Sequence, residues 1–235
     1  MPKAQKKAQA APKAPPVQPF DPLAVENIGV TLAVELLEQP LRPLPPARFA
    51  GAGVYAIYYK GGHSAYADLL ALDGSGGSKY PVYIGKAVRE NAKQGFNPAA
   101  TTKAKMWDRL NQHAESIRAV EEAGNDPGFR LEDFVCRYLV LNDAYISLAE
   151  SVLITTFRPP WNGMGLGSKV VGDKRTTQRA SLWDSLHPGR GGRPAGDAER
   201  ALLAKGKIAE GIQKLGVAPK DPRTIKMLEK IRRFL

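Results

Sequence analysis

Six side chains between residues 53 and 162 are of types that perform chemistry together. They are Tyr55, Tyr83, Arg109, His113, Glu150 and Asn162. A phenol can orient or deprotonate water when its proton has an acceptor, and histidine titrates near neutral pH. Arginine offers a planar fork that suits phosphate, and a carboxylate can hold magnesium against that phosphate. The set therefore contains the parts of a metal-dependent phosphodiesterase.

Each of these residues also has a structural explanation when it is taken alone. Tyr55 and Tyr83 lie in apolar runs, where tyrosine is common for packing alone. His113 stands within an apolar helical stripe, where a lone histidine is more often a satisfied core residue. Glu150 has apolar neighbours at helical spacing, so we expect a buried carboxylate. Such a carboxylate is either paired with an arginine or bound to a metal ion, and the residues alone leave both interpretations open.

The spacing of Arg109 and His113 weakens the structural explanation, because the two residues are one helical turn apart. Side chains at positions i and i+4 of a helix project to the same side. Arg109 would therefore stand beside His113 at the edge of the apolar stripe. A phosphate-binding cation next to a proton acceptor favours the catalytic interpretation over simple core packing.

Local patterns indicate the elements that must position these residues. Aromatic and β-branched content predicts strands at 53–59, 81–85 and 134–141, and a Gly/Ser loop, LDGSGGSK, lies between the first two. Apolar spacing predicts a helix within ENIGVTLAVELLEQP and helices at 103–122 and 145–157. Prolines stop the first and last of these helices. The order predicts an α/β (α+β) fold with a small three-stranded mixed sheet flanked by helices.

The net charge of +11 is distributed unevenly along the 235 residues. Residues 1–20 form an Ala/Pro/Lys-rich segment with a charge of +4, which predicts a disordered basic arm. Residues 21–163 carry −2, whereas residues 164–235 carry +9 and end in two predicted basic helices at 197–215 and 221–234. We expect 21–163 to be the core and 164–235 to extend the same structural unit. The asymmetry favours a polyanionic partner such as nucleic acid over a merely solvated basic surface.

Composition also bounds the cellular compartment. No apolar run approaches the roughly 18–20 residues that a membrane span needs, and the N-terminus lacks the apolar core of a secretory signal. The single cysteine, Cys136, excludes an intrachain disulfide and lies in the apolar run FVCRYLVL, so we expect it to be buried. A reducing, bacterial cytoplasm is the expected location.

Several motifs resemble those of a known nuclease family. GVY (53–55) and YIG (83–85) resemble the two signature tripeptides of the GIY-YIG superfamily, and helical Arg109, helical Glu150 and late Asn162 follow in the order of that superfamily. More narrowly, YPVYIGKA, RLNQHAESI, PPWNG and SLWDSLHPGR are similar to GIY-YIG type II restriction endonucleases that cut the palindrome CCGCGG. The resemblance covers roughly residues 25–235 and implies the GIY-YIG core fold with an N-terminal arm and a C-terminal helical extension.

The resemblance implies a role for each of the six residues. Tyr55 would activate the attacking water as general base, and His113 would accept or relay its proton. Tyr83 would position water and phosphate, and Arg109 would bind the scissile phosphate. Glu150 would hold one divalent ion, Mg²⁺, and Asn162 would complete the hydrogen-bond network. Lys86, which follows the second motif, is a further candidate for phosphate contact.

Two departures from the superfamily pattern bear on the assignment. Valine replaces the middle isoleucine of the first tripeptide, which is a conservative packing change. The interval between the tripeptides is far longer than in most of the superfamily. This insertion is similar to the restriction-enzyme branch and argues against a homing or excision-repair role by analogy.

A palindromic target implies a twofold homodimer on double-stranded DNA, and host biology implies a cognate methyltransferase. Arginine is the commonest reader of guanine, so candidates for base contact come from the 164–195 segment. They are Arg175, Gln178, Arg179 and Arg190. Two alternatives remain: a structure-directed repair or recombination nuclease, and a DNA-binding protein that kept the fold but lost catalysis.

Overall fold

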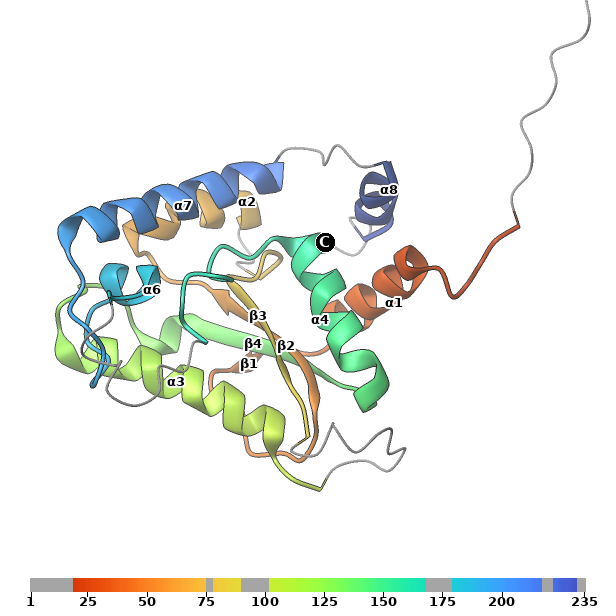
Figure 1. Ribbon diagram of the computed structural model, residues 1–235, viewed down its shortest axis with the longest axis horizontal. Coiled ribbons are helices and arrows are strands. Elements are labelled where there is room, and N and C mark those ends of the chain that lie inside the picture. The colour runs from red at the N-terminus through yellow and green to blue at the C-terminus, as the bar shows by residue number, and fades with distance from the viewer. Residues whose placement is uncertain (1–18, 75–77, 90–101, 168–178, 217–221, 232–235) are drawn as a thin grey trace, which may run out of the picture.

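Figure 1 shows the protein as a computed structural model, which describes residues 19–74, 78–89, 102–167, 179–216 and 222–231. Its helices and strands, in chain order, are α1 (Val25–Glu38), β1 (Arg42–Pro43), β2 (Gly53–Tyr59), α2 (Ala67–Asp73), β3 (Tyr83–Ala87), α3 (Lys105–Ala123), β4 (Phe134–Val140), α4 (Asp143–Phe157), α6 (Leu182–Leu186), α7 (Ala198–Gly216) and α8 (Pro222–Ile231). Short 3-10 turns at Ser64–Tyr66 and Leu131–Asp133 precede α2 and β4.

The described strands form one sheet in the order β1-β4-β2-β3, and every neighbouring pair is antiparallel. The predicted α/β class, with helices flanking a small sheet, is confirmed. The described sheet has four strands where three were predicted, and it is antiparallel where a mixed sheet was predicted. Two residues, Arg42 and Pro43, make the additional edge strand by pairing with Cys136 and Val135. So short a strand carries no alternating pattern that a sequence could display.

The central strand β2 is buried along its whole length because helices cover both faces of the sheet (Figure 1). Successive side chains of a strand point to opposite faces. Tyr55, Ile57 and Tyr59 accordingly pack with buried side chains of α3, α6 and α7. Val54 and Ala56 pack on the other face with α1, α4 and α8. This double cover holds Tyr55 rigidly on the face toward α3.

The predicted elements around the six candidate residues are present. The three strands, the two helices that carry Arg109 and Glu150, and the helix within 26–40 are all confirmed, as are both C-terminal helices. Cys136 is buried as expected. α2 and α6 were not predicted. Residues 1–18 lie outside the described residues, so the disorder of the arm stays a prediction. Arg175 and Gln178 also lie outside the described residues. In the part of the chain that is described, no helix has the length and apolarity to span a membrane.

Candidate active site

Tyr55 and His113 meet in the interior between the sheet and α3. The Tyr55 hydroxyl lies 2.8 Å from His113 Nε2, and both side chains are buried. Tyr55 pairs across β2 and β3 with Gly85, the glycine of the YIG motif. A Cβ at Gly85 would lie only 2.5 Å from the Tyr55 hydroxyl oxygen. Glycine is therefore needed at position 85 so that the phenol can lie across β3 and reach α3.

The protonation of this pair follows from its burial. Burial raises the pKa of Tyr55, nearby Tyr83 raises it further, and the Arg109 guanidinium acts in the opposite direction. Burial, reinforced by the charges of Arg109 and Arg190, lowers the pKa of His113 to about 3. At neutral pH both groups are uncharged, and in the tautomer with its proton on Nδ1 the imidazole accepts the Tyr55 O–H at Nε2. The phenol thus has a proton acceptor at hydrogen-bond distance.

Tyr83, on β3, packs against the rings of both Tyr55 and His113. Its ring centroid lies 4.9 Å from that of His113 and 6.2 Å from that of Tyr55. Tyr83 is half-buried and lines an open groove of about 500 Å³ together with Arg109 and Glu150. Four of the six predicted residues, Tyr55, Tyr83, Arg109 and His113, thus gather where β2 and β3 face α3, and Glu150 faces the same groove from α4.

Glu150 is less buried than its apolar helical neighbours suggested. Its side chain is 24% exposed, and its Oε2 lies 2.9 Å from the ammonium group of Lys86 on β3. The ion pair that the sequence left open exists, with a lysine rather than an arginine as partner. An oxygen donor that already attracts a cation and faces a solvent-filled groove fits a hard divalent ion, which prefers carboxylate and water oxygens. Asp108 is a second carboxylate among the lining residues of the groove, which also include Lys105.

Asn162 contacts the backbone of β3 rather than the aromatic side chains. Its Oδ1 accepts from the Ile84 N–H at 2.9 Å, and its Nδ2 donates to the Ile84 carbonyl at 2.8 Å. Ile84 lies between Tyr83 and Gly85. The described contacts of Asn162 therefore fix the strand segment that carries the YIG motif.

Comparison with known proteins agrees with this geometry. A family model described as the Eco29kI GIY-YIG domain, a restriction endonuclease family, matches residues 47–214. The chain belongs to this family. The match spans β2 to most of α7 and so includes all six predicted catalytic residues. A comparison with curated proteins gives no match.

Membership of the Eco29kI GIY-YIG family makes the chain a restriction-type nuclease with DNA as its substrate. Within this family member, two of the candidates for DNA contact can be compared directly. Arg179 is 63% exposed, and its guanidinium lies 3.8 Å from Asp197 and 3.9 Å from Glu199. Such long surface pairs leave the guanidinium accessible to a phosphate or a base edge.

Arg190 of the GIY-YIG domain has a different environment. Its side chain is only 6% exposed, and its Nε donates to Asp184 at 2.6 Å. Nη1 donates to the Leu166 carbonyl at 3.0 Å, and the guanidinium lies 4.6 Å from the centre of the Trp183 ring. These contacts occupy both ends of the guanidinium fork. The structure therefore places Arg190 as a link between α6 and the 165–167 loop.

A second polar group in this nuclease was missed by sequence reasoning. His63, Asp126 and His187 come from three distant segments, and their candidate ligand atoms lie within 4.8 Å of one another. His63 Nε2 lies 2.8 Å from one oxygen of Asp126, and His187 Nδ1 lies 2.5 Å from the other. The residue types could hold a divalent metal ion. His63 and His187 lie in glycine- and proline-containing segments without periodicity, so the sequence offered no spacing signal.

The hydrogen bonds around this His–Asp–His group account for it without a metal ion. His63 Nδ1 accepts from the Ala65 N–H, which leaves the proton of a neutral ring on the Nε2 that faces Asp126. A metal-binding histidine normally donates its other ring N–H, whereas this Nδ1 is an acceptor. His187 Nε2 contacts the Tyr66 hydroxyl at 2.5 Å, and that oxygen accepts from Trp161 Nε1 at 2.8 Å. The group is best described as a buried hydrogen-bond network.

Proposed function

We propose that the chain is a type II restriction endonuclease that cuts both strands of duplex DNA at the palindrome CCGCGG. The main support for this proposal is the 2.8 Å contact between the Tyr55 hydroxyl and His113, beside a groove that Arg109 and Glu150 line from two helices. Family membership supports a restriction-type nuclease, and the quoted motifs support the narrower target. A twofold homodimer, one active site per strand and a cognate methyltransferase belong to the same proposal.

In this proposal Tyr55 orients and deprotonates the attacking water, and His113 takes the phenolic proton through Nε2. His113 is uncharged at working pH because its pKa is lowered to about 3, so one ring nitrogen is open to a proton, and the proposal assigns this to Nε2, which faces the Tyr55 hydroxyl. Arg109 binds the scissile phosphate. Its guanidinium is held at 2.8 Å by Gln112 Oε1 and lowers the pKa of Tyr55, which favours the phenolate that general-base catalysis requires.

Glu150 is the residue that would hold a divalent ion, Mg²⁺, in the groove. A bound divalent ion supplies positive charge against the phosphate oxygens and the leaving oxygen. Lys86 pairs with Glu150 and donates to Ser147 Oγ at 3.4 Å, so its ammonium group already lies at the groove. We propose that Lys86 contacts the DNA phosphate, since its ammonium group would be released from Glu150 if that carboxylate held the ion. Asn162 keeps β3, and with it Tyr83, in register.

The basic 164–235 segment would read and wrap the DNA. Among its candidates, exposed Arg179 has the geometry for a contact with DNA, and Arg175 and Gln178 remain candidates from sequence. A GC-only palindrome suits arginine readers, because the guanine edge accepts two hydrogen bonds from one guanidinium. Buried Arg190 is not included in this proposed reading set.

The test is incubation of unmethylated plasmid with the native protein and with Glu150→Ala, each in Mg²⁺ and in EDTA. We expect discrete fragments that map to CCGCGG, and their loss by at least about 100-fold in the variant and in EDTA. DNA binding in a gel shift should stay within a few-fold of native. Glu122→Ala removes an exposed carboxylate elsewhere and should cut like the native protein.

Each other outcome has a definite meaning. Cuts or nicks without sequence preference, or only at branched DNA, would support the structure-directed nuclease instead. Intact plasmid with every protein, together with retained gel shifts, would support a DNA-binding protein without catalysis. Equal loss of binding and cleavage in Glu150→Ala would make the Lys86 ion pair structural rather than catalytic.

A further inference from the structure

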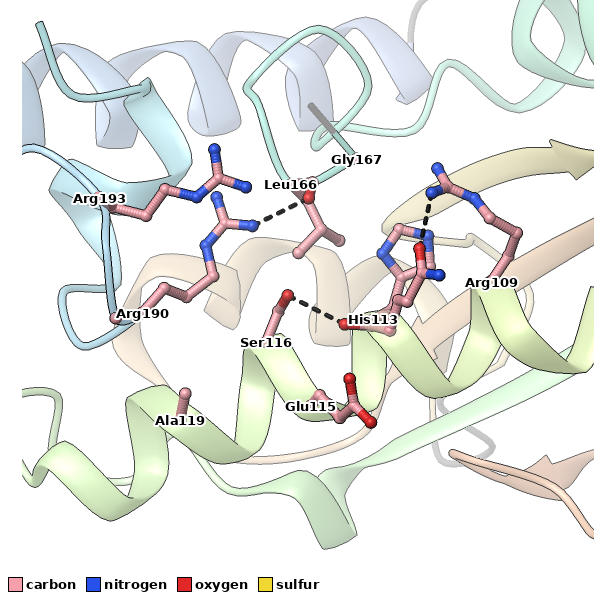
Figure 2. Close-up of a pocket in the computed structure, with 11 residues that line it drawn as sticks. Arg109, His113, Glu115, Ser116, Ala119, Leu166, Gly167, Arg190 and Arg193 are labelled. Carbon is pink, nitrogen blue, oxygen red and sulfur yellow. Dashed lines mark hydrogen bonds between the residues drawn. The ribbon is translucent and has the colours of Figure 1, made fainter. Parts of the chain in front are cut away.

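A second pocket, of about 320 Å³, lies beside the catalytic groove and farther along α3 (Figure 2). The two hollows share Arg109, Gln112 and Gly167 as lining residues. The second pocket then continues along α3 past Ser116. Seven residues of helix separate Arg109 from Ser116, or about 10 Å at 1.5 Å per residue.

The walls of this pocket carry an excess of positive charge. Figure 2 shows Arg190 and Arg193 reaching from the segment after α6 toward Leu166, opposite the α3 residues. Arg190 pairs with buried Asp184, and Arg109 and Arg193 also line the pocket. His113 is uncharged because burial and the nearby arginines lower its pKa. Glu115 is the acid among the lining residues.

The uncharged lining of the pocket includes the polar side chains of Gln112 and Ser116 beside the apolar Ala119 and Leu166. Ser116 donates to the Gln112 carbonyl at 3.0 Å, which leaves its hydroxyl oxygen toward the pocket wall. Gln112 is exposed and accepts from Arg109 through Oε1, so its amide N–H₂ remains the end that can donate to an anion. Cations and an amide donor in an open pocket next to Arg109 suit a phosphodiester better than a base or an apolar ligand.

We propose that this pocket binds a phosphodiester of the cut strand that flanks the scissile phosphate, with Arg193 as its principal cation. The inference rests on the proposed function, since it assumes that the scissile phosphate lies at Arg109. A strand anchored there must continue in both directions. One direction leads along α3 into the pocket between Arg109 and Arg193, where the 165–167 loop forms the opposite wall.

The test measures binding in EDTA, so that no cleavage is required, on duplexes that contain CCGCGG. In a series of duplexes, one phosphate at a time is replaced by an uncharged methylphosphonate. The proteins are native, Arg193→Gln, Arg193→Lys, and Arg118→Gln as a control that removes an exposed arginine of α3 outside the pocket. Thermal unfolding of each variant verifies that it is folded.

We expect native protein to lose affinity when one flanking phosphate is neutralised, and Arg193→Gln to be insensitive at that position alone. Its plot of log affinity against log salt should also fall in slope by about one unit. Arg193→Lys should respond like native protein. If Arg193→Gln follows the native pattern at every position, or behaves like Arg118→Gln, the pocket is no phosphate site. Absence of DNA binding by native protein would overturn the proposed function as well, whereas binding in EDTA combined with no plasmid cleavage in Mg²⁺ would overturn only the proposed function.

Discussion

At the scale of single residues, the buried pair of Tyr55 and His113 holds its proton on the wrong partner for catalysis. Burial raises the pKa of the phenol and lowers that of the imidazole, so the resting proton belongs to Tyr55. Proton transfer therefore needs a state in which the phenolate is stabilised. Arg109 already acts in that direction, and bound substrate with a divalent ion would add to it. If Tyr55 is the general base, as we propose, this arrangement keeps it inactive until DNA is present.

Tyr55→Phe should separate catalysis from folding. The substitution removes only the hydroxyl that contacts His113, so we expect cleavage to fall by about 10²–10⁴-fold while DNA affinity stays within a few-fold of native. His113 Nε2 would lose its buried partner, at a cost to stability of about 1–3 kcal/mol. Plasmid cleavage, gel shifts and urea unfolding measure the three quantities.

Tyr59→Phe provides the matched control on the same strand. The Tyr59 hydroxyl also makes a hydrogen bond, since it accepts from the His63 N–H at 2.8 Å. Its partner, however, lies in the segment that follows β2 and not on α3. This variant should lose stability similarly and keep its cleavage rate. A comparable loss of cleavage in both variants would show that the effect of Tyr55→Phe comes from altered packing.

Some of the residue chemistry was visible in the sequence. The i, i+4 spacing of Arg109 and His113 predicted one shared face, and the strands predicted the approach of the tyrosines. The roles of Arg190 and of the His–Asp–His network were not predictable, because their partners come from segments far apart in the chain. A buried arginine and an exposed one look alike in a glycine-rich sequence, and only the fold distinguishes Arg190 from Arg179.

At the scale of elements, α6 holds the 165–167 loop over the active site. Arg190 donates to the carbonyls of Gly165 and Leu166 while it pairs with Asp184 of α6. The loop then passes so close to the groove that a Cβ at Gly167 would lie 2.5 Å from the Tyr83 hydroxyl. A short helix and one arginine thus determine the position of the wall that faces Tyr83.

We expect Arg190→Met to destabilise the protein by about 3 kcal/mol, since it leaves the Asp184 carboxylate buried without its ion-pair partner. Arg179→Met should cost less than about 1 kcal/mol, because its ion pairs are long and exposed. Urea unfolding compares the two. For DNA binding the order of the two effects should reverse. Arg179→Met should reduce the slope of log DNA affinity against log salt more than Arg190→Met does. Equal stability of both variants would contradict the structural role of Arg190.

Helices with long apolar spacing were the elements that the sequence predicted well, because α3 and α4 repeat their pattern over several turns. α6 has five residues and β1 has two, so neither is long enough to show a period. α2 lies in the long interval between the tripeptides, where neighbouring glycines favour a loop. The assignment of 164–235 to the same structural unit as the core stays a prediction.

At the scale of the whole molecule, the buried titratable groups link stability to pH. Burial lowers the pKa of His113 to about 3 and also lowers the pKa of His187, against the raising effect of Asp126. Between pH 6.5 and these lower values the unfolded chain binds more protons than the folded chain. Stability is therefore fully present above about pH 6.5 and is lost as the pH falls.

We expect the free energy of unfolding to decrease between pH 7.5 and pH 5, by at most about 1.4 kcal/mol per pH unit for each of these two histidines. His113→Asn should have a shallower dependence, since one of the two groups is removed. Urea unfolding at several pH values measures the slope. A flat profile for native protein would contradict the buried, uncharged state of both histidines.

The two hydrogen bonds between the Asn162 side chain and the Ile84 backbone also bear on aggregation. β3 is one of the two outer strands of the described sheet, and an outer strand exposes backbone groups that can recruit a strand from another molecule. Here Trp161 N–H donates to the Val82 carbonyl, and the Asn162 amide takes both backbone groups of Ile84. The 161–162 corner imitates a neighbouring strand at these positions. We therefore expect this corner to disfavour edge-to-edge aggregation along the strand that carries the YIG motif.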